Sequence, residues 1–348
     1  MYIGVDTHKK LHVLVALDEQ GRGRGMRTIA NTPADWLEGL TWARSLEAER
    51  CWGLENSGSL GRGFAQFLLT QGEGMVHEVS PHRTAQYRRW GRRQDKTDEL
   101  DALAIARLLM AEAADLPLVL PDDVGTELRL LSDHRDQMLV ERTRVINQLH
   151  AQMLQIDPEY LAASGPLTRL PGVRYCWELV VPEASRVVQT RVLIAHQLAA
   201  HLLHLVEALA QVTTLLRQRV HETGTPLLRM PGVGEVVAAR LIGELGSTPR
   251  VPSAAALAAL AGIAPVAVSS GGRGGYRLNH GGNRQLNRAF HVIALTQRRC
   301  EPRARAYYAK KLAEGKTKRA AMRCLKRRLV DVLFPLLERP PLVHLAAA

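Results

Sequence analysis

The chain has 348 residues, and its 46 Lys and Arg against 34 Asp and Glu give a formal net charge of +12 and a pI near 10.0. This length allows two or three domains, and the positive charge favours a polyanionic partner over a basic protein that has none. The four cysteines form no CxxC pair, and no secretory signal or membrane-length apolar run is recognised, so we expect a reduced, cytoplasmic protein without structural zinc, a disulfide framework or a membrane partner.

The first third of the chain alternates strand and helix signals. Short apolar runs predict strands at residues 2–6, 12–17, 27–29, 51–54 and 75–79. Helical spacing predicts a helix over residues 33–44, with Thr32 as N-cap and Pro33 in the first turn, and another over residues 58–71. Two adjacent strands followed by alternating strands and helices indicate an α/β layer fold with a mixed sheet.

From about Pro121 the pattern changes to long helices. A heptad-spaced apolar seam consists of Leu198, Leu202, Leu205, Leu209, Val212 and Leu216. The predicted helix over residues 124–156 has a weaker seam at Leu131, Met138 and Val145. The spacing fits an internal antiparallel hairpin and a coiled coil between chains equally well.

Two segments share an apolar–Arg–apolar–Pro–Gly–Val pattern, LTRLPGVRY (167–175) and LLRMPGVGE (227–235). Only the second continues with Gly234 and a clear helical pattern over residues 236–245. Pro-Gly-Val-Gly before a helix is typical of the turn of a helix-hairpin-helix, whose glycines let backbone N–H groups approach a phosphate. A tight turn without function would have the same sequence.

Four carboxylates fall where an α/β fold gathers them. Asp6 and Glu55 end two predicted strands, and Asp98 and Asp101 share one face at the start of a helix. Carboxylates brought together in this way are typical ligands of Mg²⁺, which two-metal phosphodiester enzymes use. The alternative treats each acid separately, with Asp98 as an N-cap and Glu55 as a solvated strand end.

The segments MYIGVDTHK (1–9), GLENSG (53–58) and KTDELDA (96–102) resemble the RuvC-type, RNase H-like domain of the DEDD insertion-sequence transposases. This is the IS-one-ten family, described as bridge-RNA-guided recombinases. The resemblance implies that Asp6, Glu55, Asp98 and Asp101 are the catalytic, metal-binding quartet. Asp95 and Glu99 lie outside the pattern and are interpreted as helix-start or surface acids.

RMPGVGEVVAARLIGELG (229–246), LAGIAPVAVSSGG (260–272) and GGNRQLNRAFHVIAL (281–295) resemble the C-terminal transposase domain of the same family. The resemblance implies that Ser270, before Gly271, is the nucleophile, with Ser269 as the adjacent alternative. From the residues alone, SSGGRGG (269–275) would be a flexible loop, because no neighbouring His or Asp supplies a base, although His280 follows ten residues later.

Basic segments predict contacts with nucleic acid, and the alternative for each is a solvated surface. The residues concerned are Arg88, Arg89, Arg92, Arg93, Arg273, Arg277, Arg284, Arg288, Lys318 and Arg319. QYRRWGRRQ (86–94) interleaves cations with aromatic residues, which suits single strands or RNA. Arg284 and Arg288 are an i, i+4 pair, and Lys318 and Arg319 belong to the basic run 306–330.

Together these patterns predict an α/β plus all-α protein. We expect an RNase H-like (RuvC-like) DEDD domain at residues 1–118, a helical, coiled-coil region at 119–225, and a C-terminal helical transposase domain with a helix-hairpin-helix at 226–348. The resemblance covers nearly the whole chain, and the helical middle is its least distinctive part.

The resemblance implies a DNA transposase in which Ser270 attacks a phosphodiester and forms a 5′-phosphoserine link. It also implies Mg²⁺, with Mn²⁺ as the alternative, a noncoding bridge RNA, and donor and target double-stranded DNA. Dimers would pair into a tetramer, the quartet of one subunit completing a site with the serine of another, and part of this contact is expected at the heptad seam. Two rivals are a metal-dependent nuclease or junction resolvase that uses water, and a non-catalytic nucleic-acid scaffold.

Overall fold

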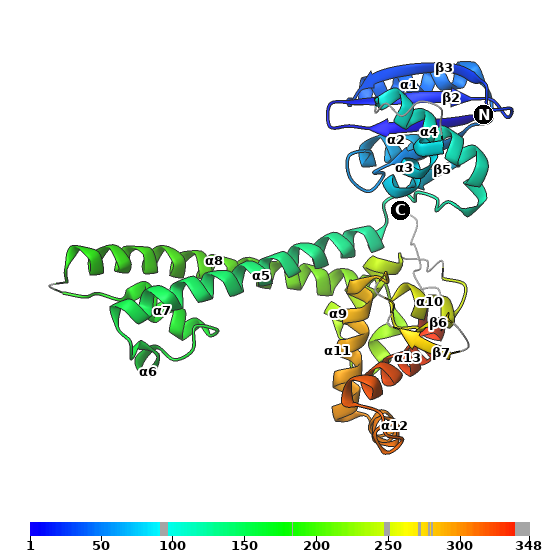
Figure 1. Ribbon diagram of the computed structural model, residues 1–348. Helices are drawn as coiled ribbons and strands as arrows, with labels where there is room; N and C mark the ends of the chain where they lie inside the picture. The colour runs from blue at the N-terminus through cyan, green and yellow to red at the C-terminus, as the bar shows by residue number, and fades with distance from the viewer. Residues whose placement is uncertain are drawn as a thin grey trace. The chain divides into compact units, whose positions relative to one another are not determined.

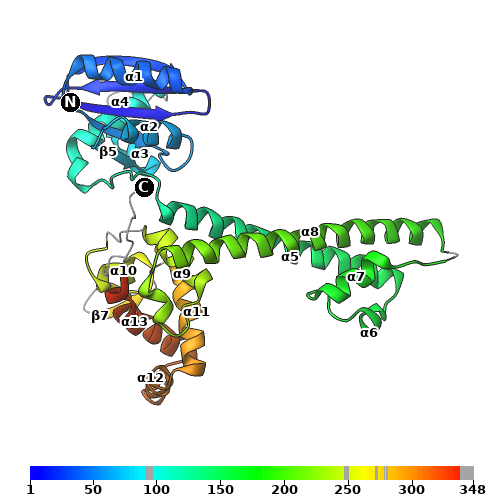
Figure 2. The same ribbon diagram turned by 180° about the vertical axis from the view of Figure 1, so that it is seen from behind.

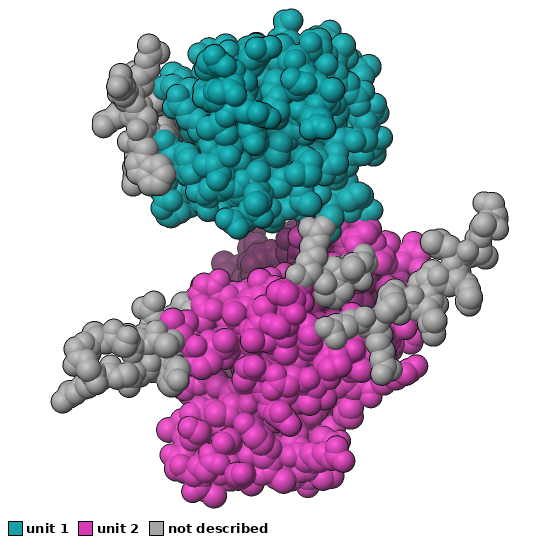
Figure 3. Space-filling view, turned by 90° about the vertical axis from the view of Figure 1, so that its right-hand side faces the viewer, with its two compact units in different colours: residues 1–122 teal, residues 123–348 magenta. Residues whose placement is uncertain are grey.

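The computed structural model describes residues 1–90, 97–182, 184–246, 251–270, 273–277, 279 and 281–337, with the backbone alone at 88–90, 267–270 and 273–277. The chain divides into two compact units, Met1–Asp122 and Asp123–Ala348, which Figure 3 shows in different colours.

Unit 1 is built on a five-stranded mixed sheet of order β3-β2-β1-β4-β5. Its strands are β1 (Tyr2–Thr7), β2 (Leu11–Leu17), β3 (Gly23–Ala30), β4 (Cys51–Glu55) and β5 (Val76–Val79). The first three pair antiparallel, and β4 and β5 run parallel to β1. The predicted mixed sheet is therefore confirmed. β3 is several residues longer than its apolar run, because every residue of this strand except Ile29 is exposed and the longer part has no apolar pattern.

Helices cover both faces of this sheet (Figures 1 and 2). They are α1 (Pro33–Leu46), α2 (Arg62–Thr70), α3 (Pro81–Trp90) and α4 (Asp98–Glu112), with a short 3₁₀ turn at Ala113–Asp115. Leu40 of α1 and Phe64 of α2 pack with Trp52 on one face, and Ala102 and Ala106 of α4 pack on the other. Thr32 caps α1 as predicted, since its side chain accepts the Asp35 N–H.

The approach of α4 to the sheet depends on Gly4. A Cβ at this position would lie 2.2 Å from the carbonyl oxygen of Ala102 and 2.4 Å from the backbone nitrogen of Ala106. The absence of a side chain at Gly4 thus lets the helix backbone lie directly on β1. Gly53 is the equivalent position on β4, where a Cβ would be 3.2 Å from the Ile105 side chain.

The helix predicted over residues 58–71 begins only at Arg62. Asn56 adopts a positive φ of 55°, and its carbonyl accepts the N–H groups of Ser59 and Gly61. These bonds hold residues 56–61 in turns, so the predicted helix is wrong for residues 58–61 and confirmed from Arg62 to Thr70.

Unit 2 begins with a long helical hairpin. α5 (Val124–Ile156) and α8 (Arg186–Glu222) lie side by side and antiparallel, and the short helices α6 (Tyr160–Ser164) and α7 (Leu170–Glu178) lie near its far end (Figure 1). Leu202 and Leu205 of the seam are buried with Met138 and Val145 of α5. Of the two alternatives, the structure shows the internal hairpin, in which Leu202 and Leu205 of the seam pack against α5 of the same chain.

One helix prediction near this hairpin needs correction. The first Pro-Gly-Val segment also enters a helix, α7, because Pro171 fits its first turn and Val173 and Cys176 are buried. Among the described residues, α8 alone is long and apolar enough by length and composition to span a membrane. This is weak evidence for a span, because α8 packs its seam along α5.

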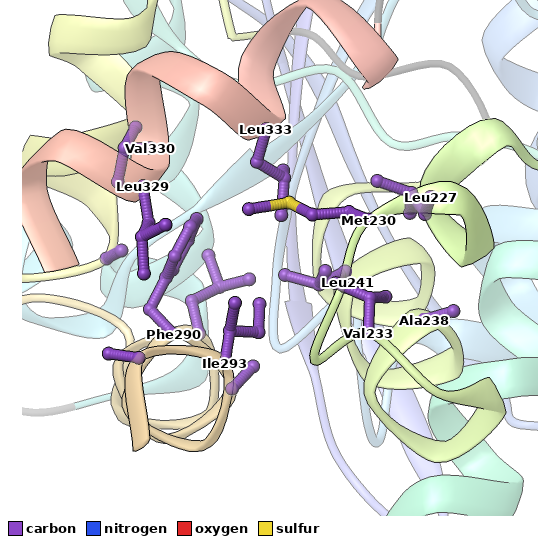
Figure 4. Close-up of a cluster of buried hydrophobic side chains, with 14 of the residues drawn as sticks. Leu227, Met230, Val233, Ala238, Leu241, Phe290, Ile293, Leu329, Val330 and Leu333 are labelled. Atoms are coloured by element: carbon purple, nitrogen blue, oxygen red, sulfur yellow. The ribbon is translucent and has the colours of Figure 1, made fainter. Parts of the chain in front are cut away.

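The rest of unit 2 is a helical domain with one β-hairpin. Its elements are η2 (Pro226–Arg229), α9 (Glu235–Leu245), α10 (Ala254–Leu260), β6 (Val266–Ser270), β7 (Arg273–Arg277), α11 (Arg284–Cys300), α12 (Pro302–Ala313) and α13 (Lys318–Leu337). Figure 4 shows its core, where Phe290 and Ile293 of α11 face Leu333 of α13 and Leu241 of α9. The loop expected from the residues at 269–275 is wrong for Ser269, Ser270 and residues 273–275, which belong to the antiparallel β6–β7 pair, while residues 271 and 272 lie outside the described residues.

Candidate active site

The strand ends of unit 1 direct two carboxylates to the face that α4 covers. Val5 and Leu54 pair in register and pack on the opposite face, whereas Gly4 and Gly53 face α4. Side chains alternate along a strand, so Asp6 and Glu55 project toward α4 from neighbouring strands. Asp6 is buried, with 6% of its surface exposed, and Glu55 is half-buried.

The backbone at the end of β4 is fixed by its neighbour. The hydroxyl of Thr7 donates a 2.7 Å hydrogen bond to the carbonyl oxygen of Glu55. Gly61 closes over this pair, since a Cβ there would lie 2.8 Å from the Thr7 methyl group. The ends of β1 and β4 are thereby held together at the site.

The other two predicted carboxylates belong to the first turn of α4. Thr97 is the N-cap, and its hydroxyl accepts the Leu100 N–H, so the alternative in which Asp98 caps the helix is wrong. Asp98 is then the first helical residue and is exposed, while Asp101 lies one turn further and is 8% exposed. Both lie close enough to Asp6 to raise its pKa.

His8 joins this cluster, which the sequence analysis missed. Its Nε2 atom lies 3.0 Å from Asp6 Oδ2 and 3.3 Å from Asp98 Oδ1. One ligand atom from each of the three side chains falls within 4.8 Å of the others. The signal was present in Asp-Thr-His, because residues two apart on an extended chain face the same side.

The charge of the cluster fits a cation. Burial is the main reason why the pKa of Asp6 lies above its ordinary value of 3.8; Asp101 and Asp98 raise this pKa further, and His8 opposes the rise. An ionised carboxylate buried beside others is costly unless a positive charge is added. Carboxylate oxygens are the ligands that Mg²⁺ and Mn²⁺ prefer, so the aspartates of this cluster are compatible with the divalent metal that DEDD-type domains typically use.

The predicted nucleophile lies in unit 2. Ser269 and Ser270 end β6, and Ser270 pairs with Arg273 where the strand turns into β7. The structure describes the backbone of Ser270, Arg273 and Arg277, and their side chains lie outside it, as does His280.

The predicted nucleic-acid contacts are distributed over both units. Arg284, Lys318 and Arg319 are exposed on α11 and α13. Arg288 is exposed too, but its guanidinium forms a 3.0 Å ion pair with Asp136. The side chains of Arg88 and Arg89, and residues Arg92 and Arg93 entirely, lie outside the described residues.

A mixed sheet with acids at two neighbouring strand ends and at a covering helix is typical of a DEDD nuclease or transposase domain. Residues 3–158 match the transposase model DEDD_Tnp_IS110, and residues 224–309 match the model for transposases of the IS116/IS110/IS902 family. The first match contains Asp6, Glu55, Asp98 and Asp101, and the second contains Ser270.

Three relatives agree with these matches. A protein of insertion element IS116 from Streptomyces clavuligerus is 29% identical over 97% of this chain and 94% of its own length. A protein of insertion element IS110 from Streptomyces coelicolor is 32% identical over 70% of each chain, and one of IS900 from Mycobacterium paratuberculosis is 25% identical over 99% and 97%. The chain belongs to the IS110/IS116 family of transposases, which implies a DNA-cleaving and strand-transferring enzyme.

Proposed function

We propose that this transposase is an RNA-guided serine recombinase, which inserts and excises its insertion element by strand exchange between donor and target double-stranded DNA. The observation that carries the proposal is the convergence of Asp6, Asp98 and Asp101 at the end of the Glu55 strand. We expect these four carboxylates to hold Mg²⁺, with Mn²⁺ as the alternative. A bound divalent cation would neutralise the negative charge that develops on the reacting phosphodiester.

Ser270 supplies the nucleophile in this proposal. Its hydroxyl oxygen forms a bond to the phosphorus while the bond to the 3′ oxygen breaks, which leaves a 5′-phosphoserine and a free 3′-hydroxyl. The serine loses one proton and the 3′ oxygen gains one, so the exchange consumes no water. Ser270 ends β6 at the hairpin turn, a position that suits the approach of a DNA strand, and Ser269 is the alternative nucleophile.

The proposal includes two kinds of partner. A noncoding bridge RNA pairs with donor and target DNA and sets sequence choice, while the protein holds backbones and performs the chemistry. The net charge of +12 and the exposed Arg284, Lys318 and Arg319 support contacts with such polyanions. The acidic site of one subunit would act with the serine of another, in dimers that pair into a tetramer in the cytoplasm.

A trapping assay tests the covalent step. Purified chain, its flanking noncoding RNA, Mg²⁺ and labelled donor and target DNA are mixed, and a denaturation-resistant protein–DNA adduct is sought. We expect an adduct with the wild type, none with Ser270→Ala or Asp101→Ala, and a retained adduct with Ser269→Ala. Loss of the adduct in Ser269→Ala alone would show that Ser269, and not Ser270, is the nucleophile.

A metal-dependent nuclease or junction resolvase is the second candidate. The observation that favours it is that Asp6, His8, Asp98 and Asp101 all belong to unit 1 and need no residue of unit 2. Cleavage that survives Ser270→Ala, with no adduct in any sample, would establish this function instead. A scaffold without catalysis would give neither cleavage nor adduct.

A further inference from the structure

A cavity of about 1150 Å³ lies beside the residues that precede β6, the strand that ends at Ser270. Ile263, Ala264 and Pro265 line it just before β6 begins, and most of the other lining residues belong to α11, α12, α13 and the segment between α12 and α13. Ser270 is four residues along β6 from Val266, roughly 13 Å at the usual rise of a strand.

The wall of this cavity is strongly basic. Lys316, Arg323 and Lys326 line it, and none of the three has an ion-pair partner among the described residues. Lys311, Arg327 and Arg328 also line it, but Glu314 and Asp331 pair with them. The lining residues therefore carry more positive than negative charge, so the cavity favours an anion.

Lys326 is the unusual member of this group. Its side chain is buried, with 8% exposed, although lysine is almost never buried without a paired charge. Its ammonium donates to Asn287 Oδ1 at 2.7 Å, and it can donate three hydrogen bonds. Burial, with a smaller contribution from Arg323, lowers the pKa of Lys326, so folding alone gains nothing from this charge.

Asn287 connects the buried lysine to the serine hairpin. Its amide nitrogen donates to the carbonyl oxygens of Ala261 and Gly262, at 2.8 and 3.3 Å. Gly262 has a positive φ of 64°, and a Cβ on Gly282 would lie 2.2 Å from its backbone nitrogen. The turn that leads into β6 is therefore closely packed and fixed relative to Lys326.

We propose that this cavity is a phosphate-binding site, in which Lys326, assisted by Arg323 and Lys316, binds a backbone phosphate of nucleic acid at a fixed distance from Ser270. The inference rests on the proposed function in that the phosphate belongs to a nucleic acid. DNA and RNA offer the same phosphodiester chemistry, and the experiment distinguishes them.

The test is a binding titration on the full chain with Ser270→Ala as background, so that no strand transfer interferes. The probes are labelled single-stranded DNA, single-stranded RNA and duplex DNA of one sequence. Adding Lys326→Met should weaken the binding of at least one probe about tenfold. It should also reduce the slope of log K against log salt for that probe by about one. The probe that loses affinity identifies the source of the phosphate.

Lys310→Met is the matched control, because it removes the same charge from an exposed position of α12 outside the cavity wall. It should change each Kd by less than about twofold. An equal loss in both variants, or no loss with Lys326→Met, would overturn the proposal.

Thermal unfolding provides a second readout. Lys326→Met should raise the Tm in phosphate-free buffer because it removes a buried unpaired charge, and inorganic phosphate should raise the wild-type Tm but not that of the variant. If Lys326→Met does not fold, Lys326→Arg, which keeps the charge, should still bind the nucleic-acid probes and should still show a higher Tm in phosphate. A wild-type Tm that responds equally to phosphate and to chloride of the same ionic strength would contradict the proposal.

These outcomes are independent of the covalent step. Failure of Ser270 to form an adduct would remove the recombinase function and leave binding through Lys326 intact. Loss of the Lys326 effect would remove this site and leave the serine chemistry intact.

Discussion

Two regions of the chain gather like charges, with opposite signs. In unit 1 the buried Asp6 lies with the carboxylates of Asp98 and Asp101, and in unit 2 the buried Lys326 lies with Arg323. Neither arrangement favours folding, because a buried charge beside like charges is costly. Such groups cluster at functional sites, and the partners that we propose for the two regions differ, a divalent cation in one and a phosphate in the other.

A third buried charge shows the contrast. Glu73 accepts hydrogen bonds from Arg44, Arg50 and Trp52 at 2.7 to 3.2 Å. Burial alone would raise its pKa, but these donors outweigh burial and hold the pKa of Glu73 below its ordinary value of 4.5. Glu73 is thus a structural charge paired with two arginines, whereas Asp6 contacts His8 beside other carboxylates and Lys326 contacts the neutral Asn287.

The largest effect is expected from Gly4→Ala. The new Cβ would overlap the backbone of α4, so α4 must move away from β1. We expect a loss of about 3 kcal/mol or more in the free energy of unfolding and loss of metal binding, measured by denaturant unfolding and Mg²⁺ titration. Gly58→Ala is the matched control, since no atom lies within 4 Å of its added Cβ, and an equal loss there would refute the packing account.

Asp6→Asn should separate activity from stability. Removing a buried carboxylate beside Asp98 and Asp101 should raise the Tm of the metal-free protein, while strand transfer falls about a hundredfold or more. Mg²⁺ should raise the wild-type Tm and leave that of Asp6→Asn unchanged. A lower Tm for Asp6→Asn without metal would show that its charge is structural.

Glu73→Gln should have the opposite effect on stability, a loss of about 2 kcal/mol at pH 7. Because the folded-state pKa of Glu73 lies below 4.5, its stabilisation is present above pH 4.5 and is lost as the pH falls through the folded pKa. The difference in unfolding free energy between wild type and variant should therefore shrink in acid. A difference that stays constant with pH would mean that ionisation of Glu73 does not contribute.

Asn287→Ala should give the smallest effect, about 1 kcal/mol. The substitution removes the bonds to Lys326 and to the Ala261 carbonyl, so the turn before β6 should loosen. Hydrogen exchange at Ile263 and Ala264 should accelerate relative to the wild type, whereas exchange in unit 1 should not change. Unchanged protection of these two amides from exchange would show that Asn287 does not position the β6–β7 hairpin.

The sequence predicted the acidic site better than the basic cavity. Asp6 and Glu55 fall at strand ends, and Asp98 and Asp101 at a helix start, which short-range periodicity locates. In the structure Asp6, Asp98 and Asp101 lie close together. His8 was missed because its role depends on where α4 places Asp98. Thr97 was missed as the cap because Asp98 fits the same role one residue later.

The basic cavity depends on contacts that local patterns do not encode. Lys326 was one cation in a basic run, and its burial results from packing between α13 and α11. The pairing of α8 with α5 was likewise open, because a heptad seam specifies an apolar partner but not which chain provides it. The β6–β7 hairpin was expected as a loop because Gly and Ser are weak strand formers.

The most direct test of the account is Mn²⁺ binding, followed by the electron paramagnetic resonance signal of the free ion, in the wild type, Asp6→Asn, Asp98→Asn and Lys326→Met. The account predicts binding by the wild type and Lys326→Met, and at least about tenfold weaker binding by the two aspartate variants. Equal Mn²⁺ binding by all four proteins would contradict the assignment of the acidic cluster as the metal site of this transposase.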